Sequence, residues 1–304
     1  MTTLTRPWAQ RCRRWWPGRR RRDPEATMSV LDHLLELRRR LAWALAALAV
    51  GTVAGFVWYE NGVLGVPSLG SLLIEPYCSL PPSARAGLGG TDCRLLATGP
   101  FDQFLLRVKV AATAGVVLSA PGWLGQLWAF VTPGLRRHER RGAVVFISTA
   151  SLLFAGGAVV AYLVVAQALR FLLGIGNSVQ TTALRGDEYY SLVLSLMVVF
   201  GVGFLTPLVV VMLNRVGVVS YQRLASWRRG MVFGAFLFAG IATPGGDPIS
   251  MAVLGVALCV LLELAVQVCR LHDRRRARRD PGWDDLPDDE VSPLPDPTPP
   301  SNGR

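Results

Sequence analysis

The sequence predicts an all-α membrane protein with six transmembrane helices, both termini in the cytoplasm and a short last pair of spans. Two observations carry this prediction. Of the 304 residues, 51% are hydrophobic and only 17% are charged, whereas soluble domains are about a quarter charged. The apolar residues are also grouped into long runs, and about 20 apolar residues suffice to cross a bilayer core of roughly 30 Å.

Six apolar runs follow one another along the chain. The second contains Pro121, which predicts a break within that span. The runs cover approximately residues 41–59, 104–131, 143–165, 189–213, 230–242 and 249–268.

The basic residues predict the orientation. Of the 32 Lys and Arg residues, 26 lie in four clusters: residues 1–40, 136–141, 215–229 and 270 onward. Cytoplasmic loops carry the excess of Lys and Arg in membrane proteins. The clusters therefore predict cytoplasmic termini and a multi-pass protein of the cell (cytoplasmic) membrane. Because the arginines lie between spans, they favour topology signals over a nucleic-acid surface, and no nucleic-acid partner is expected.

The last two apolar runs are short. Residues 230–242 and 249–262 would each form a helix of about 20 Å, and the intervening segment TPGGDP cannot continue a helix. A short hairpin can thin the bilayer locally. It can equally be buried beside longer helices, and the sequence favours neither alternative.

Three other segments complete the organisation. Residues 1–27 form a basic extension that is either genuine or a misassigned start before Met28, and residues 28–272 are the membrane domain. Residues 273–304 are predicted to be a disordered cytoplasmic tail, because Pro and Asp dominate it. Residues 60–100 are predicted to be an outward-facing loop. They contain Cys78 and Cys93, which could form a disulfide in an oxidising compartment.

Two stretches at the predicted cytoplasmic boundary combine acidic and basic residues. His33-Leu-Leu-Glu36-Leu-Arg38-Arg-Arg precedes the first span. The other stretch lies at the end of the second span. It begins with Gln126-Leu-Trp128-Ala-Phe130, contains Pro133 and ends with Arg-Arg-His138-Glu139-Arg-Arg. Taken alone, each stretch is more simply a topology signal whose glutamate pairs with a neighbouring arginine.

Together, the two stretches resemble the cytoplasmic signatures of the TatC family of twin-arginine protein translocase subunits, H-L-x-E-L-R-x-R and W-A-F-x-x-P-x-L-x-x-H-E-R-R. Further resemblances follow in the family's order over about residues 28–272. They are Ser119-Ala120-Pro121, Glu188-Tyr189-Tyr190, Phe200 to Phe204 with Thr206-Pro207, Thr243-Pro244 with Asp247, and Leu262-Glu263. Pro76 and Pro133 are also assigned to the family's structural motifs. The family's intramembrane glutamate is replaced by Leu205.

The resemblance implies a receptor that binds twin-arginine signal peptides of folded proteins for export driven by the proton gradient, and not an enzyme. Two consecutive arginines need two carboxylates, since each guanidinium can make paired hydrogen bonds to one. Glu36 and Glu139 match the family's recognition residues. The other residues expected at the signal-peptide site are Arg38, Gln126, Trp128, Phe130 and His138.

No cofactor or metal is expected, because no ATP-binding motif, metal-ligand spacing or catalytic set occurs in the sequence. The family implies single-span TatA- and TatB-like partners, contact with the lipid bilayer and self-association. Gln103, Thr206 and Ser250 could bond to a partner helix. A small secondary transporter is the alternative reading, but such proteins usually contain internal repeats and midplane charges.

Overall fold

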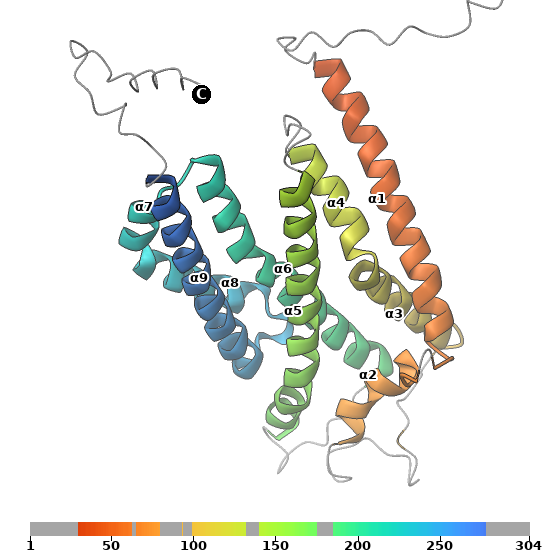
Figure 1. The fold of residues 1–304 in the computed structure, drawn as a ribbon. Coiled ribbons are helices and arrows are strands. Elements are labelled where there is room, and N and C mark those ends of the chain that lie inside the picture. The colour runs from red at the N-terminus through yellow and green to blue at the C-terminus, as the bar shows by residue number, and fades with distance from the viewer. Residues whose placement is uncertain are drawn as a thin grey trace, which may run out of the picture.

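The computed structural model describes residues 30–62, 65–79, 93, 99–131, 140–174 and 185–277, and nearly all of them are helical. The helices pack side by side in a bundle, and the long helices extend from one end of the bundle to the other (Figure 1). In chain order the elements are α1 (Val30–Trp58), α2 (Leu69–Cys78), α3 (Asp102–Leu118), α4 (Ala120–Val131), α5 (Arg140–Gly174), α6 (Gly186–Val216), α7 (Tyr221–Ser226), α8 (Arg228–Ala242), η3 (Pro244–Gly246) and α9 (Pro248–Ala277).

Within the described residues, four helices are long and apolar enough to cross a membrane: α1, α5, α6 and α9. Helices α3 and α4 together form a fifth candidate, bent by 58°. The predicted break is therefore present, and it lies at Ser119, where α3 ends. Pro121 occupies the first turn of α4, where its missing N–H costs no helical hydrogen bond. Helix α8 has only 15 residues, so length alone does not make it a crossing.

Close backbone contact holds α5 against α6 in the middle of the bundle (Figure 1). A Cβ atom built on Gly157 of α5 would lie 2.5 Å from the Phe200 carbonyl oxygen of α6. A Cβ atom built on the neighbouring Gly156 would have nothing within 4 Å. Small residues permit such close approach between transmembrane helices, so the glycine at 157 sets the spacing of this helix pair.

Because Gly157 contacts α6 and Gly156 does not, the same substitution should have opposite effects at these two positions. Gly157→Ala should lower the free energy of unfolding by about 1–3 kcal/mol, because the backbone of α6 must move. Gly156→Ala should be neutral or stabilise by up to about 1 kcal/mol through better helix propensity. Unfolding of the detergent-purified variants would measure both changes, and equal effects would contradict the proposed packing.

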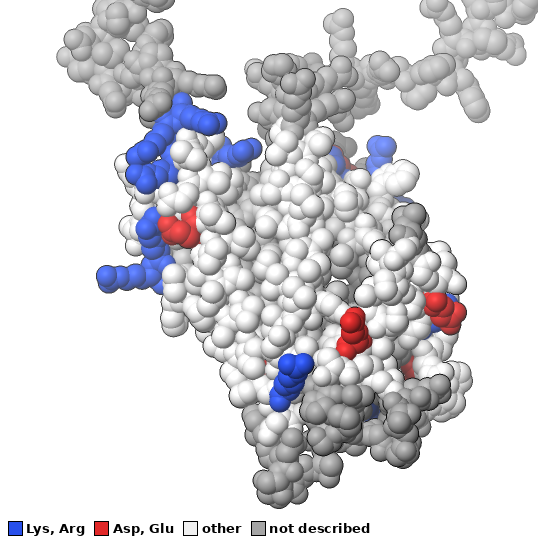
Figure 2. All heavy atoms as spheres, turned by 60° about the horizontal axis from the view of Figure 1, so that its bottom comes forward, with Lys and Arg blue, Asp and Glu red and all other residues white. Residues whose placement is uncertain are grey.

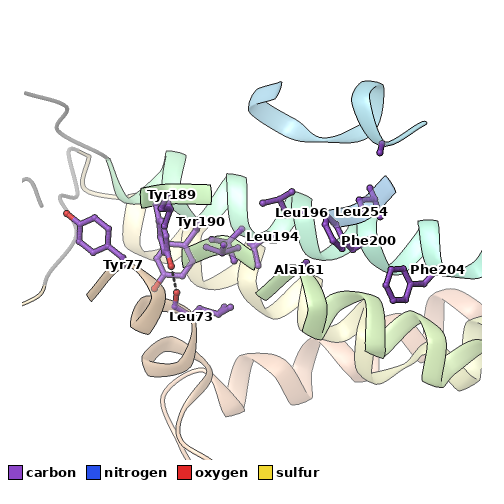
Figure 3. Close-up of a cluster of buried hydrophobic side chains, with 14 of the residues drawn as sticks. Leu73, Tyr77, Ala161, Tyr189, Tyr190, Leu194, Leu196, Phe200, Phe204 and Leu254 are labelled. Atoms are coloured by element: carbon purple, nitrogen blue, oxygen red, sulfur yellow. Dashed lines mark hydrogen bonds between the residues drawn. The ribbon is translucent and has the colours of Figure 1, made fainter. Parts of the chain in front are cut away.

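The outer loop expected from the sequence contains a helix, α2, which was not predicted. The Tyr162 hydroxyl of α5 donates a hydrogen bond to the Leu72 carbonyl over 2.9 Å. The Tyr189 hydroxyl of α6 donates one to the Leu73 carbonyl over 2.5 Å (Figure 3). A disulfide joins Cys78, the last residue of α2, to Cys93. The two tyrosine hydrogen bonds attach α2 to α5 and α6, and the disulfide attaches it to Cys93.

The sequence did contain a signal for α2. Ser68 accepts a hydrogen bond from the Ser71 backbone N–H as the N-cap of the helix. The buried side chains that follow have helical spacing. Pro76 lies inside this short helix and is buried. The Gly, Pro and Ser content of the surrounding loop concealed this pattern.

Helices α8 and α9 form the predicted hairpin around η3. Thr243 and Asp247 flank the turn in extended conformations, and Gly245 and Gly246 adopt positive φ angles of 76° and 62°, so helix cannot continue through it. Only one face of α8 packs on the rest of the chain, and Phe233 on the other face is 69% exposed. The alternative of a hairpin buried beside longer helices therefore does not describe α8 within this chain.

The other helix ends differ modestly from the predicted boundaries. Helix α1 begins at Val30, so the motif at residues 33–40 is part of the same helix as the first span. Helix α9 continues to Ala277 and so contains the first five residues of the predicted tail. With 30 residues it is longer than the short last helix that the sequence predicted. The basic extension of residues 1–27 and tail residues 278–304 lie outside the described residues.

Candidate functional site

The two acidic-basic stretches meet at one end of the bundle. The ring of His33 on α1 stacks on the ring of Phe130 on α4, with centroids 4.8 Å apart and planes inclined by 29°. Helix α5 begins at the same end of the bundle (Figure 1). Three segments that are far apart in the sequence therefore converge here.

Glu36 lies nearly one helical turn beyond His33 on α1. Its Oε1 atom accepts hydrogen bonds from Arg40 Nε at 3.1 Å and from Arg40 Nη2 at 2.5 Å. The side chain retains 28% exposure. The i,i+4 pairing expected from the sequence is therefore present, and it leaves the carboxylate partly accessible at the surface. Arg38 is exposed nearby on the same helix.

Helix α4 contributes three half-buried side chains to this end: Gln126, Trp128 and Phe130. The ring of Trp128 stacks on Phe146 of α5 at 3.8 Å, with the planes inclined by 26°. Trp128 thus joins α4 to α5 while Phe130 joins α4 to α1. These two aromatic contacts fix the relative positions of the three helices.

Pro133, His138 and Glu139 lie outside the described residues. Their segment is bounded by Val131, the last residue of α4, and Arg140, the first residue of α5. In the sequence, Glu139 directly precedes Arg140.

Comparisons with known proteins identify the family of this chain. Residues 32–256 match the family model described as Sec-independent protein translocase protein (TatC). The chain belongs to the TatC family. It is 51% identical to the Sec-independent protein translocase protein TatC of Corynebacterium kroppenstedtii, over 90% of this chain and 69% of that protein. The corresponding protein of Frankia casuarinae is 43% identical over 91% of this chain and 75% of its own length.

A solved structure has the same fold. A crystal structure of the twin-arginine translocase receptor TatC superposes with a TM-score of 0.63 and 30% identity, covering 78% of this chain and 99% of that one. The resemblance derived from the motifs is thereby confirmed. As a TatC protein, the chain is a translocase component and not an enzyme. The part of the chain that the structure describes contains no group of three potential metal ligands.

The remaining TatC motif residues are spread over the bundle and do not join this site. Pro207 is buried within α6, and Pro244 is half-buried in the α8–α9 turn. Asp247 is fully buried, and its Oδ1 atom accepts a hydrogen bond from the Ser250 backbone N–H at the start of α9. Glu263 on α9 pairs with Arg228 at 3.0 Å. Their positions indicate roles in helix ends and the hairpin.

The three polar residues that could bond to a partner helix differ in exposure. Gln103 and Thr206 are exposed, so they remain available to a partner. Ser250 is fully buried. It therefore cannot reach a second protein in this conformation, and that expectation is wrong.

Leu205 replaces the glutamate of the TatC pattern. It packs against a buried cluster of α4 and α5 side chains that includes Leu124 and Phe154. This position is therefore an apolar contact between helices in the present protein. A carboxylate here would have to be buried among apolar groups, which is costly in a membrane.

Proposed function

We propose that this protein is the signal-peptide receptor of a twin-arginine translocase and that Glu36 and Glu139 bind the paired arginines. The observation that carries the proposal is the His33–Phe130 stack, which brings the start of α1 to the end of α4. The solved receptor with the same fold supports this assignment. A site formed by helix ends can present two acidic residues from distant parts of the sequence to one extended peptide.

The chemistry of the site suits arginine. A carboxylate has two oxygens and about four lone-pair positions, so Glu36 can hold Arg40 and accept a second guanidinium. An arginine presents a planar set of donors that a lysine cannot reproduce. The surrounding arginines of the chain oppose a cationic ligand, so the apolar part of the signal must supply affinity by packing beside Trp128 and Phe130.

The proposal includes the membrane arrangement. The site would face the cytoplasm, with six spans and both termini inside, and α8 would be a short fifth crossing. The Arg228–Glu263 pair supports a short hairpin, because it places charges 15 residues beyond the start of α9 at Pro248. The hairpin would thin the adjacent bilayer. TatA- and TatB-like single-span proteins and further copies of the receptor would assemble with it, and the proton gradient would drive export.

Complementation tests the proposed function directly. Expressed together with its own TatA- and TatB-like partners, the full chain should restore export of a folded fluorescent reporter that carries a twin-arginine signal, in cells lacking their receptor. A reporter whose two signal arginines are replaced by lysines should remain inside, because the planar fork is lost. A matched reporter with a general secretory signal serves as the control. Failure of export, with the protein inserted and its partners present, would contradict the assignment.

A further inference from the structure

A second feature lies at the other side of the same end of the bundle, where α6 ends, α7 and α8 begin and α9 ends. Five exposed arginines gather there, and we call them the basic surface. Figure 2 shows Lys and Arg side chains collected over one end of the molecule while most of the visible face is uncharged. The basic surface consists of Arg215, Arg223, Arg229, Arg274 and Arg275.

A partly buried group of hydrogen-bonded residues, which we call the hub, joins these helix ends. Asn214 of α6 is 3% exposed, and its Nδ2 atom donates to Asp273 Oδ1 of α9 at 3.0 Å and to the Val219 carbonyl at 2.9 Å. Asp273 Oδ2 accepts from the Tyr221 backbone N–H of α7 at 2.9 Å. The hub therefore fixes α6, α7 and α9 relative to one another and brings arginines from all three helices together.

The acidic side chains at this end do not neutralise the basic surface. The described residues between 210 and 277 include two carboxylates here, Glu263 and Asp273. Glu263 pairs with Arg228, which is not part of the basic surface, and Asp273 is engaged in the hub. No residue of the basic surface forms an ion pair within the described part of the chain. The surface thus retains a positive charge.

Exposed apolar side chains lie among these arginines. Val216 is 65% exposed, Val218 is 57% exposed and Trp227 is 72% exposed. Apolar groups of this size are stabilised at a membrane boundary, where Trp is enriched. A soluble polyanion would leave them in water. The basic surface lies at the ends of α6 and α9, which are two of the candidate spans. Residues at the end of a span are at the level of the lipid headgroups.

We propose that the basic surface binds the headgroups of anionic phospholipids in the adjacent leaflet, with Trp227, Val216 and Val218 inserted beside them. Arginines near a membrane surface attract anionic lipid strongly, and several on neighbouring helices can hold one phosphate or two. The basic surface shares no residue with the proposed signal-peptide site. The proposal does not depend on signal-peptide binding, and it holds whichever compartment this end faces.

The test uses the full-length protein in neutral detergent, titrated with short-chain phosphatidylglycerol or phosphatidylcholine and observed by native mass spectrometry. The wild type should bind phosphatidylglycerol more tightly. Arg223→Gln combined with Arg274→Gln should weaken that binding roughly 30-fold, at about fivefold for each arginine. Lys109→Gln combined with Arg170→Gln removes the same charge from exposed positions at the opposite end of the bundle and should leave the affinity unchanged.

Thermal unfolding of each variant in lipid-free detergent separates lost binding from lost folding. A folded double variant with reduced phosphatidylglycerol binding supports the proposal. Equal affinity of the wild type for the two lipids would overturn it, as would equal losses in the two double variants. Binding of a heparin fragment, with no binding of phosphatidylglycerol, would identify a site for soluble polyanions and would also overturn the lipid proposal.

Discussion

Glu36→Gln and Glu139→Gln should each weaken binding of a twin-arginine signal peptide by roughly 10- to 100-fold. A hydrogen bond to a charged group contributes about 1.5–3 kcal/mol, and replacing a carboxylate by an amide removes the charge while keeping the shape. The double variant need not show the product of the two losses, because two residues that bind one ligand are coupled. Titration of the detergent-purified receptor with a labelled synthetic signal peptide would measure these affinities.

A comparison of two peptides distinguishes lost arginine recognition from misfolding of the variants. A twin-lysine peptide should bind the wild type more weakly than the twin-arginine peptide, and both glutamine variants should reduce that difference. Glu75→Gln is the matched control, because Glu75 is an exposed glutamate on α2 at the opposite end of the bundle, near the Tyr162 hydroxyl at 3.4 Å. Undiminished binding in both site variants would remove the assignment of Glu36 and Glu139.

Removing the Cys78–Cys93 disulfide should lower the free energy of unfolding by about 3 kcal/mol. The disulfide closes a loop with a sequence separation of 15, and the loop-entropy relation gives this value for 15 residues. The loss should affect the end of the bundle near α2 most, because the disulfide joins the last residue of α2 to Cys93. Chemical unfolding of Cys78→Ala combined with Cys93→Ala would measure the change.

A reductant provides the control for this prediction. Reduction should destabilise the wild type and Cys259→Ala by similar amounts, since Cys259 is a free thiol on α9. It should have no further effect on the Cys78/Cys93 double variant. A double variant that remained sensitive to reductant, or a wild type that was insensitive to it, would contradict the stabilising role of this bond.

Much of the fold was predictable from local patterns. The long apolar runs predicted α1, α5 and α6, because a helix in lipid needs about 20 apolar residues whatever its neighbours are. Pro121 predicted the break between α3 and α4, since a proline disrupts a continuing helix. The prolines and glycines of residues 243–248 predicted the α8–α9 turn for the same reason. Each of these properties depends on residues that are close in the sequence.

Part of the candidate site was also predictable, but only through combined motifs. Glu36 and its pairing with Arg40 follow from helical spacing. Each glutamate alone resembled an ordinary charge in a basic cluster. The order of several stretches along the chain indicated the family, and the family comparison confirmed that membership. The roles of the two glutamates stay a prediction.

The tertiary structure decided the contacts between distant segments. No local pattern indicates that His33 stacks on Phe130, that Tyr189 holds α2, or that Asn214 meets Asp273. Burial of Ser250 and the apolar surroundings of Leu205 likewise depend on neighbouring helices. Helix formation in a membrane satisfies the backbone within each segment, so the sequence specifies the segments, whereas packing between their side chains decides which surfaces form a binding site.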